Sequence, residues 1–189
     1  IRYAVLFSAA DGQMRAETDH RSYAYGRLAG QIHGCVDRLP QTLERFHIDH
    51  ELLLDAPLRA IEPFLAHRPK DYDHLCDTAL SLKARIDELL SKEAPVYGIC
   101  HGDFNRTNVH FDDADAPTVF DFDCFGYGWR AYDLAVFGWQ AGDFGWSKTA
   151  KANRTRRWNL FLRGYEEHRT LSAAEHEAVK VFPPIRQIW

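Results

Sequence analysis

Residues 100–111 of this 189-residue chain read CHGDFNRTNVHF, and residues 118–123 read TVFDFD. Between positions 101 and 123 the chain carries six aspartates and a single arginine. Massed negative charge lowers stability unless a cation neutralises it. Side-chain oxygen atoms of Asp and Asn are ligands that suit Mg²⁺. This stretch therefore predicts a site for a divalent metal.

Three polar residues in the stretch have the order and spacing that phosphoryl transfer requires. The reaction needs a carboxylate that orients and deprotonates an acceptor hydroxyl, and Asp103 can supply it. It also needs a metal-bound amide oxygen five residues later and a second metal-binding carboxylate from a neighbouring hairpin strand. Asn108 and Asp121 meet those two requirements, and Gly102 permits a tight turn before Asp103.

Three motifs together resemble a known family. Residues 101–103 (HGD) followed by Asn108 resemble the catalytic loop H-G-D-x-x-x-x-N of aminoglycoside phosphotransferases, choline kinases and their bacterial relatives. Residues 121–123 (DFD) resemble that family's metal motif, and residues 132–135 (YDLA) resemble the start of its next helix. The resemblance implies an α+β, protein-kinase-like fold. The chain would be its mainly helical C-terminal lobe, with a small β insert that carries the catalytic and metal-binding loops.

The resemblance also assigns roles within the acidic stretch. Asp103 would be the catalytic base, and Asn108 and Asp121 would hold the Mg²⁺ that neutralises the phosphates of ATP. Asp123 would assist the metal or the substrate. The implied cofactors are therefore Mg²⁺ and ATP.

Residues outside that stretch would complete the site. His101 and Asp133 would brace the catalytic loop without reacting. Phe7, Ser8 and Ala9 would offer backbone groups to the adenine ring.

The resemblance divides the chain unequally. Residues 1–12 resemble the last strand of the small lobe and the hinge, and residues 13–189 resemble the large lobe. The family carries its Gly-rich phosphate loop and its phosphate-binding lysine in the small lobe, which is expected to be absent here. We therefore expect flanking sequence beyond both ends of the chain and no activity from this fragment alone. Relatives often have His at the position of Asn105 and Gly at that of Thr107, so Asn105 receives no acid–base role.

Hydrophobic spacing predicts the remaining elements. Apolar residues at every third or fourth position indicate helices, and short apolar runs between turn residues indicate strands. Gly126 and Gly128 fit a tight loop after the metal motif. Helices are expected over 18–39, 52–66, 72–90, 130–140, 149–169 and 173–189, and strands over 3–7, 96–100, 108–111 and 118–122.

Composition narrows the class further. Hydrophobic residues make up 46% of the chain and charged residues 26%, which is ordinary for a globular domain. A formal net charge of −4 disfavours a nucleic-acid or anionic-membrane partner. No apolar run approaches the roughly 20 residues that span a bilayer. No basic-then-apolar leader is recognisable, so a signal peptide is not expected. Since the four cysteines contain no C-x-x-C pair, a reducing cytoplasm is the expected compartment.

Three nearby features have two readings each. Cys100, His101 and Cys124 match no common zinc pattern, so a buried, hydrogen-bonded His101 is expected instead. Basic residues between 148 and 157 are read as a solvated helix face, with an anionic partner as the alternative. The aromatic residues after the metal motif could form a wall that binds a cationic amine, or they could belong to ordinary packing, which is favoured. They are Phe125, Tyr127, Trp129, Trp139 and Trp146.

The implied activity is phosphorylation of a hydroxyl group on a small molecule such as an aminoglycoside, choline, homoserine or another amino alcohol. Negative charge at the site favours an amine-bearing acceptor. Two other classes stay open. A non-catalytic, pseudokinase-like lobe would bind a ligand without turning it over. A metal-dependent phosphohydrolase using Asp103, Asp121 and Asp123 would release phosphate without an acceptor.

Overall fold

The computed structural model describes residues 6, 8–39, 43–140 and 148–189, apart from the side chains of Trp139 and Gln140. The strand expected over 3–7 lies outside this part of the chain except for Leu6. The helices are α1 (Asp19–Val36), α2 (Ala56–Ile61), α3 (Pro69–Leu89), α4 (Arg130–Gln140), α5 (Lys148–Glu166) and α6 (Ala173–Ile188). The strands are β1 (His47–Ile48), β2 (Tyr97–Cys100), β3 (Val109–Phe111), β4 (Pro117–Val119) and β5 (Gly126–Trp129).

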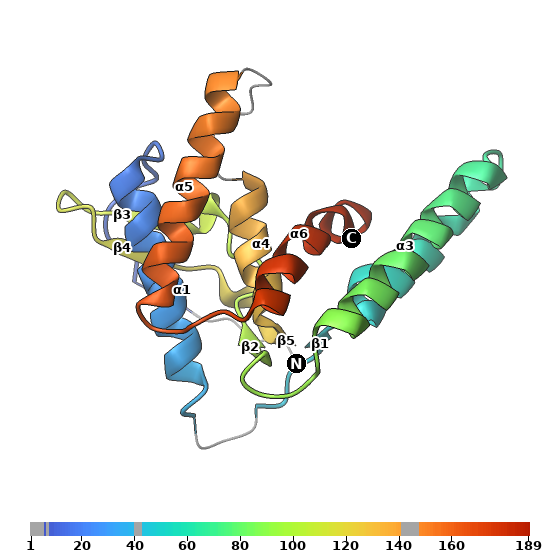
Figure 1. Ribbon diagram of the computed structural model, residues 1–189, viewed down its shortest axis with the longest axis horizontal. Coiled ribbons are helices and arrows are strands. Elements are labelled where there is room, and N and C mark those ends of the chain that lie inside the picture. Colours follow the sequence, from blue (N-terminus) through green and yellow to red (C-terminus); the bar gives the residue numbers. More distant parts are fainter. Residues whose placement is uncertain (1–5, 7, 40–42, 141–147) are drawn as a thin grey trace.

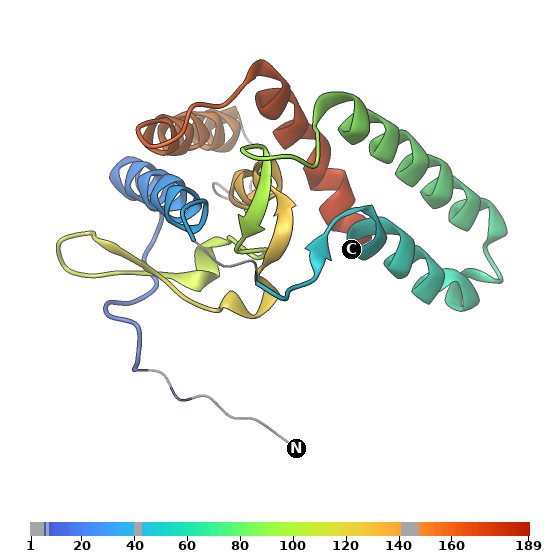
Figure 2. The same cartoon turned by 90° about the horizontal axis from the view of Figure 1, so that it is seen from below.

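The structure contains two small sheets, one near the centre of the molecule and one that reaches its edge beside α1 (Figures 1 and 2). In one, β5 lies between β1, to which it is parallel, and β2, to which it is antiparallel. The other is the β3–β4 hairpin. The tight loop expected at Gly126 and Gly128 is therefore wrong, because both glycines lie in the central strand. A Cβ at Gly126 would lie 2.6 Å from the carbonyl oxygen of Phe46, so glycine lets the preceding segment approach closely.

Helices surround these sheets on two sides. Helices α1 and α5 pack side by side, whereas α3 and the helical run before it form a hairpin that projects from the body beside α6 (Figures 1 and 2). A Cβ at Gly26 would overlap the carbonyl oxygen of Phe161, and a Cβ at Gly164 would overlap that of Tyr23. Glycine at both positions thus permits the close α1–α5 contact. No helix in the described residues is long and apolar enough to cross a membrane.

Capping residues explain where two helices begin. The Thr18 side chain accepts a hydrogen bond from the amide of Arg21 at the start of α1. Ser172 and Glu175 form a reciprocal capping box at the start of α6. Helix α1 ends at Val36, before the expected limit, and α3 begins earlier than expected, at Pro69, a residue type suited to a first turn.

Two predicted elements need correction. The single helix expected over 52–66 is a π-helical turn η1 (Glu51–Asp55), then α2, then a 3-10 turn η2 (Glu62–Leu65). Pro57 and Pro63 account for these breaks, because proline lacks an amide hydrogen and its ring crowds the preceding turn. The strand expected over 118–122 ends at Val119, and a 3-10 turn η4 (Phe122–Cys124) follows.

The loop after β2 packs against the helices through a cluster of aromatic residues. The Tyr25 ring of α1 stacks on Phe104 with centroids 4.4 Å apart, and its hydroxyl donates to the carbonyl of Asn105 at 3.1 Å. Phe137 and Phe161 stack 4.0 Å apart behind this pair. The loop therefore rests on a packed interior.

Candidate active site

The loop after β2 turns sharply at Gly102 and then forms a 3-10 turn, η3 (Arg106–Asn108), that leads into β3. Gly102 has a φ of +84°, a conformation that glycine adopts without strain. A Cβ at this position would overlap the carbonyl oxygen of Cys124. Glycine thus lets the catalytic loop and the metal motif lie in direct contact.

Asp133, in the first turn of α4, holds the backbone of this loop. Its Oδ2 atom accepts from the amide of His101 at 2.6 Å, and its Oδ1 atom accepts from the amide of Gly102 at 2.8 Å. Burial alone would raise the pKa of Asp133, but hydrogen bonds from His33 and Gly102 help to lower it. The carboxylate is therefore ionised and serves as a fixed acceptor.

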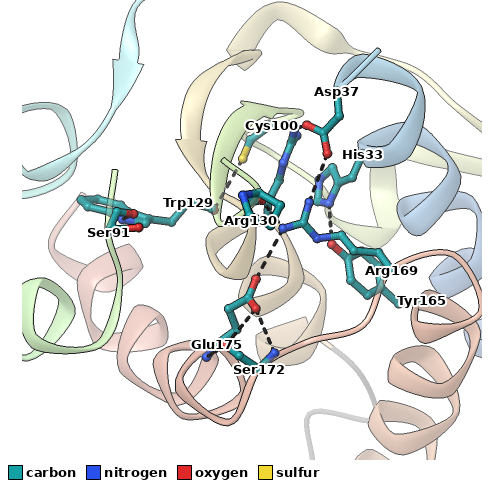
Figure 3. Close-up of polar contacts among 11 residues, drawn as sticks. His33, Asp37, Ser91, Cys100, Trp129, Arg130, Tyr165, Arg169, Ser172 and Glu175 are labelled. Carbon is teal, nitrogen blue, oxygen red and sulfur yellow. Dashed lines mark hydrogen bonds and ion pairs between the residues drawn. The ribbon is translucent and has the colours of Figure 1, made fainter. Parts of the chain in front are cut away.

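His33 of α1 supports Asp133 from the far side. Its Nε2 atom donates to Asp133 Oδ2 at 3.1 Å. Its Nδ1 atom lies 2.9 Å from the hydroxyl of Tyr165 on α5, a contact drawn in Figure 3. Burial lowers the pKa of His33, although Asp133 opposes this shift. The ring is therefore neutral, and the Tyr165 hydroxyl donates to Nδ1. One chain of hydrogen bonds thus links α5, α1, α4 and the loop.

The ring of His101 joins the loop to the metal motif. Its Nδ1 atom accepts from the amide of Asp103 at 3.3 Å, and its Nε2 atom donates to the carbonyl of Phe120 at 3.0 Å. These partners assign the proton to Nε2. His101 is buried, and the two segments are fixed relative to each other through it.

Asp103 is half-buried, and both of its carboxylate oxygens have partners. Asn108 Nδ2 donates to Oδ2 at 3.1 Å and to the backbone carbonyl of Asp103 at 3.0 Å. Arg186 Nη2, from α6, forms an ion pair with Oδ1. The structure therefore brings Asp103 and Asn108 together and adds a cation that the sequence did not predict.

Arg186 has several further contacts. Its Nη1 atom donates to the hydroxyl of Tyr132 at 2.7 Å and to the carbonyl of Gly102 at 3.3 Å, and its guanidinium lies 4.6 Å from the ring centre of Trp189. Burial lowers the pKa of Arg186, but Tyr132 and the candidate base outweigh it and raise the pKa overall. The only signal in the sequence was a cation on the otherwise apolar face of residues 182–189.

Asn108 and Asp121 meet at one end of the β3–β4 hairpin. The amide of Phe120 donates to the carbonyl of Asn108 at 3.1 Å, which places Asp121 one residue from that bond. Asp121 adopts a left-handed backbone, with φ of +63°, which is strained for a residue other than glycine. The side chains of Asp121 and Asp123 are exposed, and within the described residues neither carboxylate has a hydrogen-bond or ion-pair partner. An amide oxygen and two unpaired carboxylates form a set of oxygen donors that fits Mg²⁺.

Cys124 directly follows the metal motif, and its carbonyl oxygen lies against Gly102. Burial raises the pKa of its thiol, and the negative charges of Asp103, Asp121 and Asp123 raise it further. The candidate base and the metal motif therefore share one electrostatic environment, which a cation would stabilise.

Of the three residues expected at the adenine site, the structure describes two. Phe7 lies outside the described residues. Ser8 and Ala9 are exposed, and no hydrogen bond joins either one to another described residue.

Among the described aromatic residues after the metal motif, Trp129 and Phe125 lie in different surroundings. Trp129 is fully buried in the core, and Phe125 packs against the guanidinium of Arg45 at 4.0 Å. The side chain of Trp139 and all of Trp146 lie outside the described residues. Trp129 therefore belongs to ordinary packing.

A buried trio resembles a metal site but lacks free ligands. The ligand atoms of His33, Cys100 and Asp133 lie within 4.8 Å of one another. Both nitrogens of His33 and both oxygens of Asp133 already have hydrogen-bond partners. Burial raises the pKa of Cys100 well above its usual value, so it stays a thiol, whereas metals bind the thiolate.

Beside this trio, two arginines share one carboxylate (Figure 3). Arg130 and Arg169 both pair with Asp37 just after α1, and Arg169 also lies 3.5 Å from Glu175 of α6. Arg130 is fully buried, and its guanidinium lies against Gly98 of β2 where a side chain would overlap it. The ion pairs join α1, α4 and α6 around β2, which leads into the catalytic loop.

The chain belongs to the phosphotransferase enzyme family, whose family model matches residues 2–171. The resemblance inferred from the motifs is thereby confirmed. An uncharacterized protein of Synechocystis sp. is 30% identical over 190 residues, which cover 100% of this chain and 50% of that protein. The chain spans about half the length of the curated relatives that it matches.

Solved structures show the same fold. The amicoumacin kinase hAmiN, solved with AMP-PNP and Ca²⁺, superposes with a TM-score of 0.78 at 21% identity, covering 95% of this chain and 53% of that one. A microcompartment-associated aminopropanol kinase gives a TM-score of 0.65 at 23% identity, covering 90% and 52%. The fold is therefore α+β and kinase-like, and the chain is a mainly helical lobe with a small β insert.

Proposed function

We propose that the full-length protein carrying this chain is an ATP- and Mg²⁺-dependent phosphotransferase that acts on a hydroxyl group of a small molecule. One observation carries the proposal: the carboxylate of Asp103 is held by Asn108, at the end of the hairpin that presents Asp121. Phosphoryl transfer depends mainly on positioning and on neutralising charge. This arrangement supports both tasks, whereas the isolated chain, which has no Gly-rich phosphate loop, is proposed to be inactive.

Asp103 acts as the general base. The acceptor hydroxyl gives its proton to a carboxylate oxygen of Asp103 while its own oxygen bonds to the γ-phosphorus and the bond to ADP breaks. Each carboxylate oxygen accepts about two hydrogen bonds, so those from Asn108 and Arg186 leave room for the hydroxyl. These two side chains orient the base, and Asp133 and His101 brace the loop that carries it.

Asn108 and Asp121 would hold the metal, with Asp123 in support. The Asn108 amide nitrogen faces Asp103, and its amide oxygen accepts only a long hydrogen bond, of 3.4 Å, from Thr107 Oγ1. A carbonyl oxygen has two lone pairs, so one is left for a cation. Mg²⁺ bound there would neutralise phosphate oxygens and stabilise the charge of the transferring group. Among the described residues, no protein group pairs with the carboxylates of Asp121 and Asp123, so both are available to bind the ion.

The acceptor is proposed to bear an amine. The acidic site supports this, and two solved relatives are named as kinases of amicoumacin and of aminopropanol. The backbone of Phe7, Ser8 and Ala9 is proposed to bind adenine, as the family resemblance implies. A reducing cytoplasm is the proposed compartment, since all four cysteines are free.

Phosphoryl transfer by the full-length protein tests the proposal directly. Mg-ATP and a panel of hydroxylated amines are incubated with the protein, and mass spectrometry detects a product heavier by one phosphoryl group. Nucleotide binding without transfer to any acceptor would favour a non-catalytic lobe. Phosphate release without an acceptor would favour a phosphohydrolase, and failure to bind any nucleotide would contradict the proposed function.

A further inference from the structure

A cavity of about 120 Å³ adjoins the catalytic loop. Gly102, Cys124 and Tyr132 line it on the side of the loop, and Trp189 at the end of α6 lines it as well. Phe46 and Leu52 are among the residues that close the opposite side, where η1 packs against α6 (Figures 1 and 2). The cavity thus lies between the candidate base and the helical hairpin.

The walls of the cavity are apolar. No charged side chain lines it, and its polar side-chain groups are the thiol of Cys124, the hydroxyl of Tyr132 and the indole N–H of Trp189. That hydroxyl accepts a hydrogen bond from Arg186, and burial raises the pKa of Tyr132 to about 12, so the phenol stays neutral. The cavity therefore suits an apolar group rather than an amine.

Arg186 connects the cavity to the candidate base. Its guanidinium pairs with Asp103 and also contacts Tyr132 and Trp189, both of which line the cavity. Gly102, the residue before Asp103, lines the cavity too. A molecule whose hydroxyl is bonded to Asp103 would therefore have a neighbouring substituent within reach of these walls.

We propose that this cavity is a specificity-determining subsite that binds an apolar side chain of the acceptor. The inference rests on the proposed function and names its substrate class, an amino alcohol with a branched aliphatic or aromatic substituent. Size supports the assignment, because an apolar cavity of about 150 Å³ in another protein holds a benzene molecule. The amine of the acceptor lies outside the cavity, toward the carboxylates.

A series of amino alcohols with one headgroup isolates the effect of the side chain. Equilibrium binding of ethanolamine, alaninol, valinol and leucinol to the full-length protein is measured by calorimetry or ligand-observed NMR, without nucleotide and with Mg-AMP-PNP. Affinity is expected to rise about fourfold for each buried methyl or methylene group. Equal affinities across the series, or no binding of leucinol, would overturn the inference.

Filling the cavity should remove this preference. Leu52→Phe adds volume to the lining, whereas Leu80→Phe makes the same change at an exposed site on α3. The preference for leucinol over ethanolamine is expected to fall at least about tenfold in Leu52→Phe and to persist in Leu80→Phe. A preference that survives both changes would contradict the subsite. Phe46→Ala, which removes a partly exposed wall, should also weaken leucinol binding and serves if Leu52→Phe does not fold.

Phosphoryl-transfer assays on the same samples test the kinase function and the apolar subsite separately. Phosphorylation of some acceptor with no side-chain preference would leave the proposed function intact and remove the subsite. A side-chain preference in binding that Leu52→Phe abolishes, without nucleotide binding or transfer, would retain the subsite and remove the kinase proposal.

Discussion

The candidate catalytic loop and the candidate metal motif are neighbours, because Gly102 packs against Cys124, yet the two segments are held in opposite ways. Asp133 and His101 fix the loop from within a buried network. The motif presents Asp121 and Asp123 to solvent, with a strained backbone at Asp121. A general base must be oriented before the reaction, whereas metal ligands gain their partner only when the ion binds. Changes in the loop should therefore alter chemistry or stability, and changes in the motif should alter metal-dependent binding.

The largest effect is expected from Asp103→Asn in the full-length protein. The variant keeps the size of the side chain, but its single amide oxygen can accept from only one of Asn108 and Arg186 and cannot take up the proton. We therefore expect kcat to fall roughly 10³-fold while Mg-nucleotide affinity is preserved. Steady-state kinetics and calorimetric titration with Mg-AMP-PNP measure the two quantities. Asp113→Asn, at an exposed aspartate paired with Arg15, should leave both unchanged. Near-full activity in Asp103→Asn would show that the assigned base is wrong.

Asp133→Asn should produce the next largest effect, on stability. The buried carboxylate accepts two loop amides and the His33 donor, and an amide group cannot replace all three contacts. We expect a loss of about 3 kcal/mol in the free energy of unfolding, measured by denaturant titration of the full-length protein. Asp87→Asn, at an exposed partner of His50 on α3, provides the matched change. Similar losses in the two variants would contradict a special role for Asp133.

Asp121→Gly should preserve stability and weaken metal-dependent nucleotide binding, in contrast to Asp133→Asn. The variant removes a proposed metal ligand and suits the left-handed backbone, so stability should stay within about 0.5 kcal/mol or rise. Mg²⁺-dependent nucleotide affinity should fall at least about tenfold. Asp115→Gly is a close control, because Asp115 also has a positive φ, of 60°, but pairs with Arg21. If Asp115→Gly weakened nucleotide binding equally, Asp121 would not be a specific ligand.

Local sequence suggested the candidate site residues but not the residues that support them. The motif residues Asp103, Asn108 and Asp121 are recognisable because their spacing along the chain is short and regular. Their supports are not: Arg186 pairs with Asp103 from 83 residues away, and His33 bonds to Asp133 across 100 residues. Such contacts depend on how helices pack, which no local pattern encodes.

Strand β5 was missed for a related physical reason. Its glycines were read as turn residues from local preference, whereas the structure uses them where neighbouring backbone approaches closely. Segments with regular apolar spacing, such as α1, α3 and α6, were predicted apart from their ends. At Gly126 and Gly128, packing against neighbouring segments therefore decided the backbone conformation, and the local preference of glycine for turns did not.

The smallest effect should come from the most remote support of the loop, His33, as a dependence of stability on pH. Its pKa is lowered in the folded protein, so the unfolded chain takes up a proton at a higher pH. Above about pH 6.5 the ring is neutral in both states and its contribution is fully present. As pH falls below that value the contribution is lost, with a slope of at most about 1.4 kcal/mol per pH unit.

His33→Gln keeps a donor for Asp133 but cannot titrate, which makes the comparison decisive. The variant should be less stable than the wild type at pH 8, and the gap should narrow as pH falls toward 5, because only the wild type loses this contribution. Denaturant titrations at several pH values measure the gap. His176→Gln, on an exposed face of α6, controls for the loss of one histidine. A gap that stays constant would mean that folding does not shift the pKa of His33, which contradicts the prediction. A gap that widens on acidification would mean that the folded protein binds the proton more tightly, and the loop would then be braced by an ion pair rather than by a neutral hydrogen bond.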